Sequence, residues 1–219
     1  MIRLAIFDCD GTLVDSQHNI CRAVEEAFDS ARLVPPPRAA IRRIVGLSLV
    51  EAMRLLLPTA DPGLHQSLAD DYKAAFFRLR SSGAMAEEPL YDGMLGALDQ
   101  LSASGWTLGV ATGKSDRGLT HILTHHGILD RFVTLQTADR HPSKPHPSMI
   151  ETAMAEAGAL AGDTVMIGDT SFDMAMARAA GARAIGVAWG YHPAQELLAA
   201  GADVIVATVD ALADAVETP

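Results

Sequence analysis

Two aspartates separated by one residue open the most informative stretch of the chain. The segment DCDGTLVDS at residues 8–16 places Asp8 and Asp10 directly after the apolar run RLAIF at 3–7. Like charges at this spacing repel each other, and a buried strand gains nothing from either carboxylate. Either a cation lies beside them, or one of them does chemistry as a nucleophile or as a donor and acceptor of protons.

Three further polar motifs follow apolar runs later in the chain. They are TGKS at 112–115, SKP at 143–145 and GDTSFD at 168–173. Open parallel sheets gather their ligand sites at the carboxyl ends of the strands, so we expect these motifs to meet the first one in space. The meeting point would bring several carboxylates together with the hydroxyl of Thr112 and the ammonium of Lys144.

The elements that must position these motifs alternate after residue 90. Short apolar runs predict strands at 3–7, 107–111, 132–136, 164–168 and 183–188, with 203–206 as a sixth candidate. Helix-length segments separate them at 94–104, 116–126, 147–157, 171–180 and 194–200. Such alternation predicts an α/β fold, a parallel sheet joined by right-handed crossovers with helices on both faces.

Residues 16–88 break this rhythm, because they contain no convincing strand. Apolar residues at helical spacing predict helices at 19–31 and 64–80, and Gly46 separates two shorter helical pieces between them. We therefore expect a sheet core made of residues 1–15 and 90–219, and an inserted all-helical domain at 16–89. Hinges are expected near 14–17 and 84–91, with residues 42–49 facing the ligand site.

Composition narrows the class of protein. The chain has 219 residues, of which 49% are hydrophobic, and a net charge of −10, which disfavours binding to nucleic acid. No apolar run is long enough to span a bilayer, and the first residues are too short and too acidic for a secretory signal. Two cysteines, Cys9 and Cys21, give no disulfide framework. We expect a soluble, cytoplasmic protein that does not bind membranes.

The four motifs, in this order, resemble those of the haloacid dehalogenase (HAD) superfamily of hydrolases. The helical block is similar to the type 1 cap of that superfamily, and the tail GARAIGVAWGYHPAQELLAAGADVIV resembles its phosphoglycolate-phosphatase-like branch. The resemblance implies a Rossmann-like core with a helical cap. It also implies a Mg²⁺-dependent phosphatase that acts on a small phosphorylated metabolite, as a monomer or a homodimer.

The resemblance also implies a role for each motif residue. Asp8 would attack phosphorus and form an aspartyl-phosphate, and Asp10 would protonate the leaving group and later accept a proton from water. Thr112 and Lys144 would hold the phosphoryl oxygens. The metal would be held by Asp8, the Asp10 carbonyl, Asp169 and, less directly, Asp173. The residues expected to bind substrate are Gly11, Thr112, Gly113, Arg43 and Gly46.

Simpler structural interpretations compete with these roles. Asp10 and Gly11 could form only a turn, and Thr12 or Ser16 could cap the helix that follows. Residues 170–173 fit a capping box, so Asp173 could serve the helix alone. Lys144 could be a surface lysine. Ser115 is predicted to be an N-cap rather than a site residue.

Other polar pairs are assigned to the surface. His121 and His125 have the spacing of a helical zinc site, but a solvated helix face fits their neighbours better. Residues 70–71 and 87–88 are predicted to be solvated acids.

Two functional alternatives remain open. A sugar phosphomutase of the same fold usually carries a cap cation just after the Gly-x-Ser loop, where this chain has Leu49, although Arg42 and Arg43 precede the loop. The only cap lysine, Lys73, is far from the position that a phosphonate-cleaving relative would need. The other alternative is a non-catalytic binding module on the same scaffold.

Overall fold

The protein is built around one parallel sheet. The structure, a computed structural model, describes residues 1–218. The six strands have the order β3-β2-β1-β4-β5-β6, and every neighbouring pair is parallel. The strands are β1 (Arg3–Phe7), β2 (Trp106–Thr112), β3 (Phe132–Thr137), β4 (Thr164–Gly168), β5 (Arg183–Val187) and β6 (Val204–Val206). The predicted α/β fold is confirmed, including the sixth strand.

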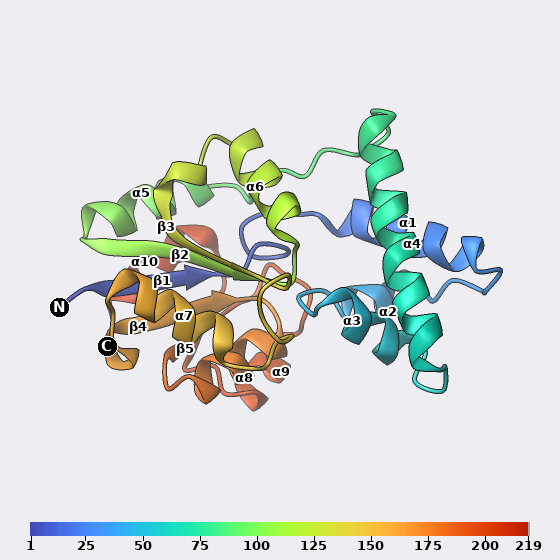
Figure 1. Ribbon diagram of the computed structural model, residues 1–219. Coiled ribbons are helices and arrows are strands. Elements are labelled where there is room, and N and C mark those ends of the chain that lie inside the picture. The colour runs from blue at the N-terminus through green and yellow to red at the C-terminus, as the bar shows by residue number, and fades with distance from the viewer. Residues whose placement is uncertain (219) are drawn as a thin grey trace.

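Helices cover both faces of the sheet (Figure 1). Along β1 the side chains alternate, so that Phe7 packs into one buried cluster and Ile6 into the other. The Phe7 face is covered by α5 (Met94–Ala103), α6 (Asp116–His125) and α10 (Leu212–Glu217). The Ile6 face is covered by α7 (Ser148–Ala157), α8 (Ser171–Ala179) and α9 (Ala194–Ala199). Short 3-10 turns lie at η1 (Leu129–Arg131), η2 (Ala161–Asp163) and η3 (Val209–Ala211).

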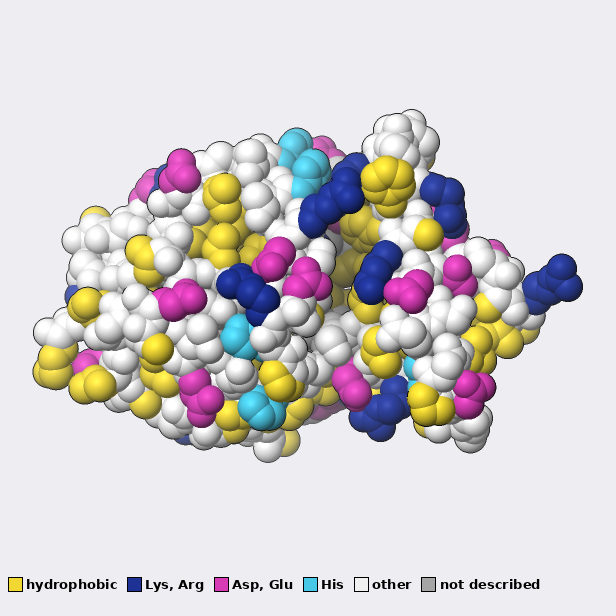
Figure 2. Space-filling view, in the orientation of Figure 1, with side chains coloured by type: hydrophobic (Ala, Val, Ile, Leu, Met, Phe, Trp, Pro, Cys, Tyr) yellow, Lys and Arg dark blue, Asp and Glu magenta, His cyan; other side chains and the backbone are white. Residues whose placement is uncertain are grey.

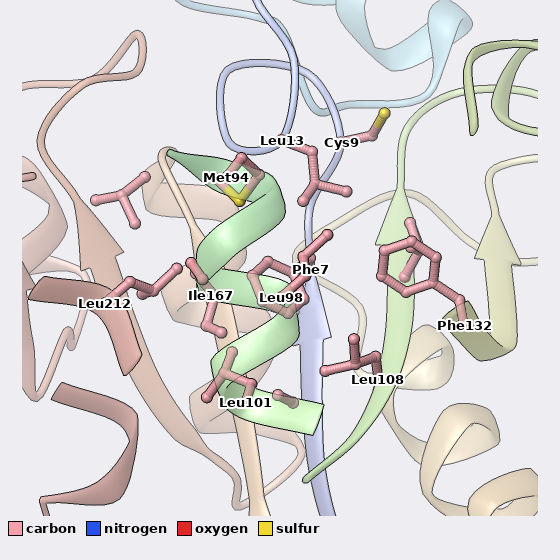
Figure 3. Close-up of a cluster of buried hydrophobic side chains, with 14 of the residues drawn as sticks. Phe7, Cys9, Leu13, Met94, Leu98, Leu101, Leu108, Phe132, Ile167 and Leu212 are labelled. Carbon is pink, nitrogen blue, oxygen red and sulfur yellow. The ribbon is translucent and has the colours of Figure 1, made fainter. Parts of the chain in front are cut away.

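The core beside α5 shows what holds the central strand in place (Figure 3). Phe7 is fully buried among Leu98 and Leu108, and its ring meets that of Phe132 edge-on at 6.5 Å between centroids. Because β1 is clamped between two apolar layers, the residue that follows it is held firmly in position.

Residues 17–81 form four helices and no strand, as predicted. They are α1 (Gln17–Ser30), α2 (Arg38–Arg42), α3 (Leu49–Leu56) and α4 (Pro62–Ser81). We call these residues the helical segment. It has an apolar cluster of its own, in which Val24, Ile41, Met53 and Leu68 are buried. Figure 1 shows the segment beyond the carboxyl ends of the strands, with α4 lying across α1.

The chain enters and leaves the helical segment at one place. The backbone N–H of Asp15 donates to the carbonyl of Pro89 at 2.9 Å, and that of Tyr91 donates to the carbonyl of Leu13 at 3.1 Å. An isolated antiparallel bridge joins Val14 to Leu90. The two connections therefore run side by side. Among residues 1–218, no helix is both long and apolar enough to cross a membrane.

Candidate active site

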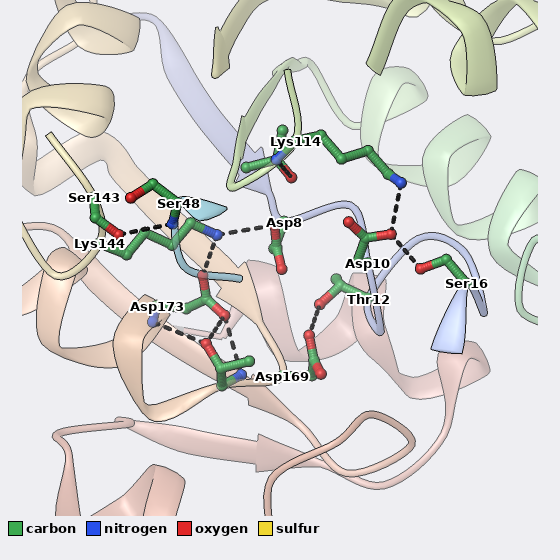
Figure 4. Close-up of polar contacts among 12 residues, drawn as sticks. Asp8, Asp10, Thr12, Ser16, Ser48, Lys114, Ser143, Lys144, Asp169 and Asp173 are labelled. Carbon is green, nitrogen blue, oxygen red and sulfur yellow. Dashed lines mark hydrogen bonds and ion pairs between the residues drawn. The ribbon is translucent and has the colours of Figure 1, made fainter. Parts of the chain in front are cut away.

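The sequence motifs converge at the carboxyl edge of the sheet, as expected (Figure 4). Asp8 directly follows β1, Thr112 ends β2 and Asp169 directly follows β4. Lys144 comes from the loop between β3 and α7, and its side chain is fully buried. Asp10 is buried as well, in the turn after β1. The polar residues that follow the separate strands thus lie together in one site.

Three carboxylates form the centre of this site. Asp8, Asp169 and Asp173 each offer one oxygen, and these atoms lie within 4.8 Å of one another. The ammonium of Lys144 lies 2.9 Å from Asp8 Oδ1 and 2.6 Å from Asp173 Oδ1. One lysine therefore offsets only part of the charge of three buried acids.

The negative charge that Lys144 leaves unbalanced contributes to raised pKa values of the acids. Burial raises the pKa of Asp8 to about 7, with Lys144 opposing the change and Asp173 and Asp10 adding to it. Burial, followed by the charges of Asp8 and Asp173, raises the pKa of Asp169 well above its usual range. Burial alone would lower the pKa of Lys144, but its acidic neighbours outweigh burial and raise it. Lys144 therefore stays positively charged, but it is too little positive charge to neutralise the three carboxylates beside it.

The three carboxylates fit a divalent metal ion. Both side-chain oxygens of Asp8 are buried and, apart from the ion pair with Lys144, have no hydrogen-bond partner among residues 1–218. An all-oxygen donor set is what hard divalent cations such as Mg²⁺ prefer. Asp169 keeps acceptor capacity, since its two oxygens each accept one bond, from Thr12 Oγ1 at 2.8 Å and from the Tyr191 N–H at 2.9 Å.

Asp173 forms the capping box considered from the sequence and also contacts Lys144. Its Oδ2 accepts from the N–H of Thr170 at 3.0 Å, and the predicted capping box at the start of α8 is present. Its Oδ1 accepts from the ammonium of Lys144 at 2.6 Å. Its Oδ2 also accepts from the Thr170 hydroxyl at 2.7 Å, so Asp173 has less free acceptor capacity than Asp169 and is better placed to hold Lys144 than to bind a metal ion directly.

Asp10 lies apart from the three-carboxylate group and has its own cation. Its Oδ1 lies 2.9 Å from the ammonium of Lys114 and accepts a bond from the Ser16 hydroxyl. Figure 4 shows Lys144 beside Asp8 and Lys114 beside Asp10, on opposite sides of the site. Burial would lower the pKa of Lys114, but Asp10 and its other acidic neighbours raise it, so this ammonium is also charged.

Sequence reasoning missed Lys114 as a site residue. The available signal was its place in TGKS, two residues after Thr112, because residues at that strand end face the same site. Ser16 also has a different contact from the predicted one. It occupies the N-cap position of α1 without a capping bond from its side chain, and its hydroxyl is used for Asp10 instead.

Three glycines line the space around the carboxylates. Gly11 has a φ of +87°, and a Cβ there would lie 2.2 Å from Asp169 Oδ2. A Cβ on Gly113 would lie 2.6 Å from the carbonyl oxygens of Gly46 and Leu47. A Cβ on Gly46 would lie 4.0 Å from Asp8 Oδ2. The turn at 46–47 of the helical segment thus forms part of the wall opposite Asp8.

The predicted substrate cation Arg43 is not brought to the carboxylates. Its guanidinium makes a bidentate pair with Glu196 of α9, at 2.7 and 2.6 Å, and nearly half of its side chain is exposed. The neighbouring Arg42 donates to Gln17 Oε1 at 3.2 Å. In this arrangement Arg43 joins the helical segment to the sheet part of the chain.

Glu88 is buried, and the prediction that it is solvated is wrong. The residue is only 8% exposed, and its carboxylate accepts from Asn19 Nδ2 at 3.0 Å. The reason is that α1 packs over the return connection, which local sequence does not reveal. Two other expectations are confirmed. Ser115 caps α6 by accepting from the N–H of Gly118 at 3.1 Å, and His121 and His125 lie on the exposed face of that helix.

The chain belongs to the haloacid dehalogenase-like hydrolases, whose family profile matches residues 5–187. The predicted family and enzyme class are therefore confirmed, together with the Rossmann-like core.

Relatives over almost the whole chain point to one branch of this family. Probable phosphatase IndB of Dickeya dadantii is 38% identical over 94% of this chain and 89% of its own. A phosphoglycolate phosphatase of Colwellia psychrerythraea is 30% identical over 88% of this chain and 87% of its own. The structure of a predicted phosphatase from Clostridium acetobutylicum superposes with a TM-score of 0.88, at 27% identity, covering 99% of this chain and 98% of that one.

The raised pKa of Asp8 would make the binding of a metal ion at this site depend on pH. Its pKa is raised from 3.8 to about 7, so the folded, metal-free protein binds more protons than the unfolded chain between these values. The stability of the metal-free protein therefore falls as pH rises through this window, and a divalent ion that replaces the proton restores it.

We expect Mg²⁺ to raise the melting temperature by at least about 3 °C more near pH 8 than near pH 5.5, roughly 1 kcal/mol for a chain of this length. Differential scanning fluorimetry measures this shift without any substrate. Asp169→Asn, which removes one ligand, should lose most of the shift, whereas Asp70→Asn on the exposed face of α4 should keep it. An equal shift at both pH values would contradict the assignment of the metal to these carboxylates.

Proposed function

We propose that the protein is a Mg²⁺-dependent phosphatase that hydrolyses a small phosphate monoester through an aspartyl-phosphate on Asp8. The observation that carries the proposal is the state of Asp8, a buried carboxylate directly after a buried strand. Apart from the ion pair with Lys144, its two oxygens have no hydrogen-bond partner among residues 1–218. The phosphatase names of the relatives support it, and the phosphoglycolate phosphatases among them make 2-phosphoglycolate the first substrate to test.

In the first half of the reaction, an oxygen of Asp8 attacks phosphorus and the bond from phosphorus to the ester oxygen breaks. The departing oxygen takes a proton from the carboxyl group of Asp10, so the substrate leaves as an alcohol. Asp10 is suited to this role because Ser16 and Lys114 fix its orientation two residues after the nucleophile.

In the second half, water attacks the phosphorus of the aspartyl-phosphate and gives a proton to Asp10. The bond between phosphorus and Asp8 breaks, which releases inorganic phosphate and restores both aspartates. Lys144 and the hydroxyl of Thr112 hold the phosphoryl oxygens during both steps, and Asp173 keeps Lys144 in place.

Mg²⁺ would be held by Asp8, Asp169 and the carbonyl of Asp10, where it would offset the repulsion between the nucleophile and the phosphate. The three-carboxylate group supports this assignment, because one lysine cannot neutralise three buried acids.

We also propose that residues 16–89 act as a cap that opens and closes over a core made of 1–15 and 90–219. The paired connections at Val14 and Leu90 support a hinge there. In the closed arrangement, two contacts join the cap to the core. The N–H of Ser48 donates to Ser143 Oγ at 2.9 Å, and Arg43 pairs with Glu196. Closure would exclude water while the leaving group is still bound.

The direct test of the function replaces the nucleophile. Asp8→Asn should reduce the turnover of every phosphate ester, including p-nitrophenyl phosphate, below detection, because an amide cannot form the acyl phosphate. Its fold should be kept, since Asn has the shape of Asp and removes one charge from a repelling group. Steady-state kinetics and circular dichroism measure both properties.

A screen of phosphorylated metabolites with Mg²⁺ and with EDTA should accompany this variant. Near wild-type turnover by Asp8→Asn, or full wild-type activity in EDTA, would refute the mechanism. Inorganic phosphate as the product separates hydrolysis from phosphoryl transfer to a sugar phosphate.

The contact between Lys114 and Asp10 predicts that replacing Lys114 lowers turnover more for esters with a poor leaving group than for esters with a good one. Lys114→Met should lower kcat for an alkyl phosphate by about tenfold or more, because a poor leaving group needs a well-oriented acid. The loss should be much smaller for p-nitrophenyl phosphate, whose phenolate departs without much help. Lys73→Met, at an exposed lysine paired with Asp70, is the matched control. Equal losses on both esters would mean that Lys114 does not act through Asp10.

The contact between Arg43 and Glu196 gives a test of the closed arrangement. Arg43→Ala and Glu196→Ala should each raise KM by about twofold to fivefold, as for an exposed ion pair, and by the same factor for p-nitrophenyl phosphate and for an anionic metabolite. The double variant should be no worse than either single one, because the two side chains form one contact. A KM change confined to the anionic metabolite would instead restore Arg43 as a substrate-binding residue.

A further inference from the structure

A second positively charged area lies where the helical segment meets the sheet part. Arg80 at the end of α4 lines a shallow, open cavity of about 430 Å³ together with Asp116, Arg117, Thr120 and His121 of α6. We call Arg80, Arg117 and His121 the basic seam. Figure 2 shows Lys or Arg side chains beside histidines at this junction. The proposed reaction steps use none of these side chains.

The two arginines of the seam lack acidic partners. Among residues 1–218, neither guanidinium has a carboxylate oxygen within ion-pair distance, and the buried Nε of Arg80 has no hydrogen-bond partner. This is notable in a chain with 27 acidic and 17 basic residues, because most of its other arginines are paired with acids. Unneutralised positive charge is therefore concentrated at this cavity.

Aromatic rings hold both guanidinium groups. Arg80 lies over the ring of Phe76, with its Cζ 5.8 Å from the centroid, and Arg117 lies over the ring of Phe77 at 5.4 Å. Stacking on a ring positions a guanidinium and leaves its N–H groups free to donate to another acceptor. The arginines are thus positioned without being neutralised.

The acids nearest the cavity are already engaged. Asp116, which also lines it, pairs with Arg140 at 3.0 Å and accepts from Thr137. Glu88, whose charge interacts with Arg80, is buried and accepts from Asn19. Burial, and then the positive charges of Arg80, His125, Arg117 and Lys114, lower the pKa of His121. This imidazole is therefore uncharged near neutral pH, and the positive charge of the seam is that of its two arginines.

We infer that the basic seam binds an oxyanion, a carboxylate or a phosphate, carried by the leaving-group part of the substrate. This inference rests on the proposed function. The seam lies near the proposed acid Asp10, because Lys114 pairs with Asp10, and the charge of Lys114 acts on His121 of the seam and, with that of Arg80, on Glu88. An oxyanion held between Arg80 and Arg117 would bridge α4 and α6, so a substrate that carries one would favour the closed arrangement.

The test compares two esters that differ in one anionic group. Glycerol 3-phosphate and 3-phosphoglycerate share a carbon skeleton, and the second has a carboxylate in place of a hydroxymethyl group. The wild type should prefer the carboxylate ester. In Arg80→Gln/Arg117→Gln that preference in kcat/KM should fall by about tenfold, the combined effect of two partly exposed charge contacts. Fructose 1,6-bisphosphate against fructose 6-phosphate extends the comparison to a second phosphate.

Controls separate charge from folding. Arg78→Gln changes an exposed arginine of the same helix that is paired with Glu26, and it should leave the preference unchanged. Arg117→Gln alone, at an exposed position, should show part of the loss if the double variant proves unstable in a melting experiment.

A second experiment tests whether the oxyanion belongs to the substrate or is a free ion. Sodium sulfate is added at constant ionic strength to assays with p-nitrophenyl phosphate, which has no second anionic group. If sulfate changes the kcat of the wild type but not that of the double variant, the seam binds a free oxyanion. That result would contradict the inference that the oxyanion is carried by the substrate. If neither the ester preference nor the sulfate response differs between wild type and double variant, the seam binds no oxyanion. Absence of all ester turnover by the wild type would refute the proposed function instead.

Discussion

Buried like charges are the constraint on which the rest of the structure depends. Asp8, Asp169 and Asp173 lie within 4.8 Å of one another in a water-poor site, and Lys144 alone cannot balance them. Such a group persists only where protons or a cation supply the missing charge, which is why burial raises the pKa of Asp8. The same shortage of positive charge would favour binding of a metal ion. The electrostatic strain and the proposed catalytic power therefore have one origin.

Holding these charges together requires a scaffold that cannot relax. The strand before Asp8 contributes Ile6 to one apolar layer and Phe7 to the other, so a shift of the carboxylate would disturb both layers at once. The neighbouring strand β4 presents Asp169 in the same way, in register with β1. The sheet thus prevents the acids from moving apart, and the polar residues begin where the strands end.

Residues whose role depends on a strand end could be predicted, because a strand end is a local property of the sequence. Asp8, Thr112 and Asp169 belong to this group, and the parallel topology then brings them together. Residues whose role depends on packing between distant elements could not be predicted. Glu88 is buried where α1 packs over the return connection, and there it accepts from Asn19, 69 residues away in the sequence. Arg43 pairs with Glu196, 153 residues away. Lys114 lies in a predicted motif, but its contact with Asp10 depends on how two loops approach each other.

The contact between the turn at 46–47 and Gly113 limits where substrate selection can occur. A Cβ on Gly113 would meet the carbonyl oxygens of Gly46 and Leu47 at 2.6 Å, so backbone meets backbone without a side chain between them. Gly46 in turn faces Asp8 without a side chain of its own. A wall made of backbone can exclude water and donate N–H groups, but it distinguishes poorly between leaving groups. Selection would therefore fall to side chains farther from the nucleophile, such as those where α4 meets α6.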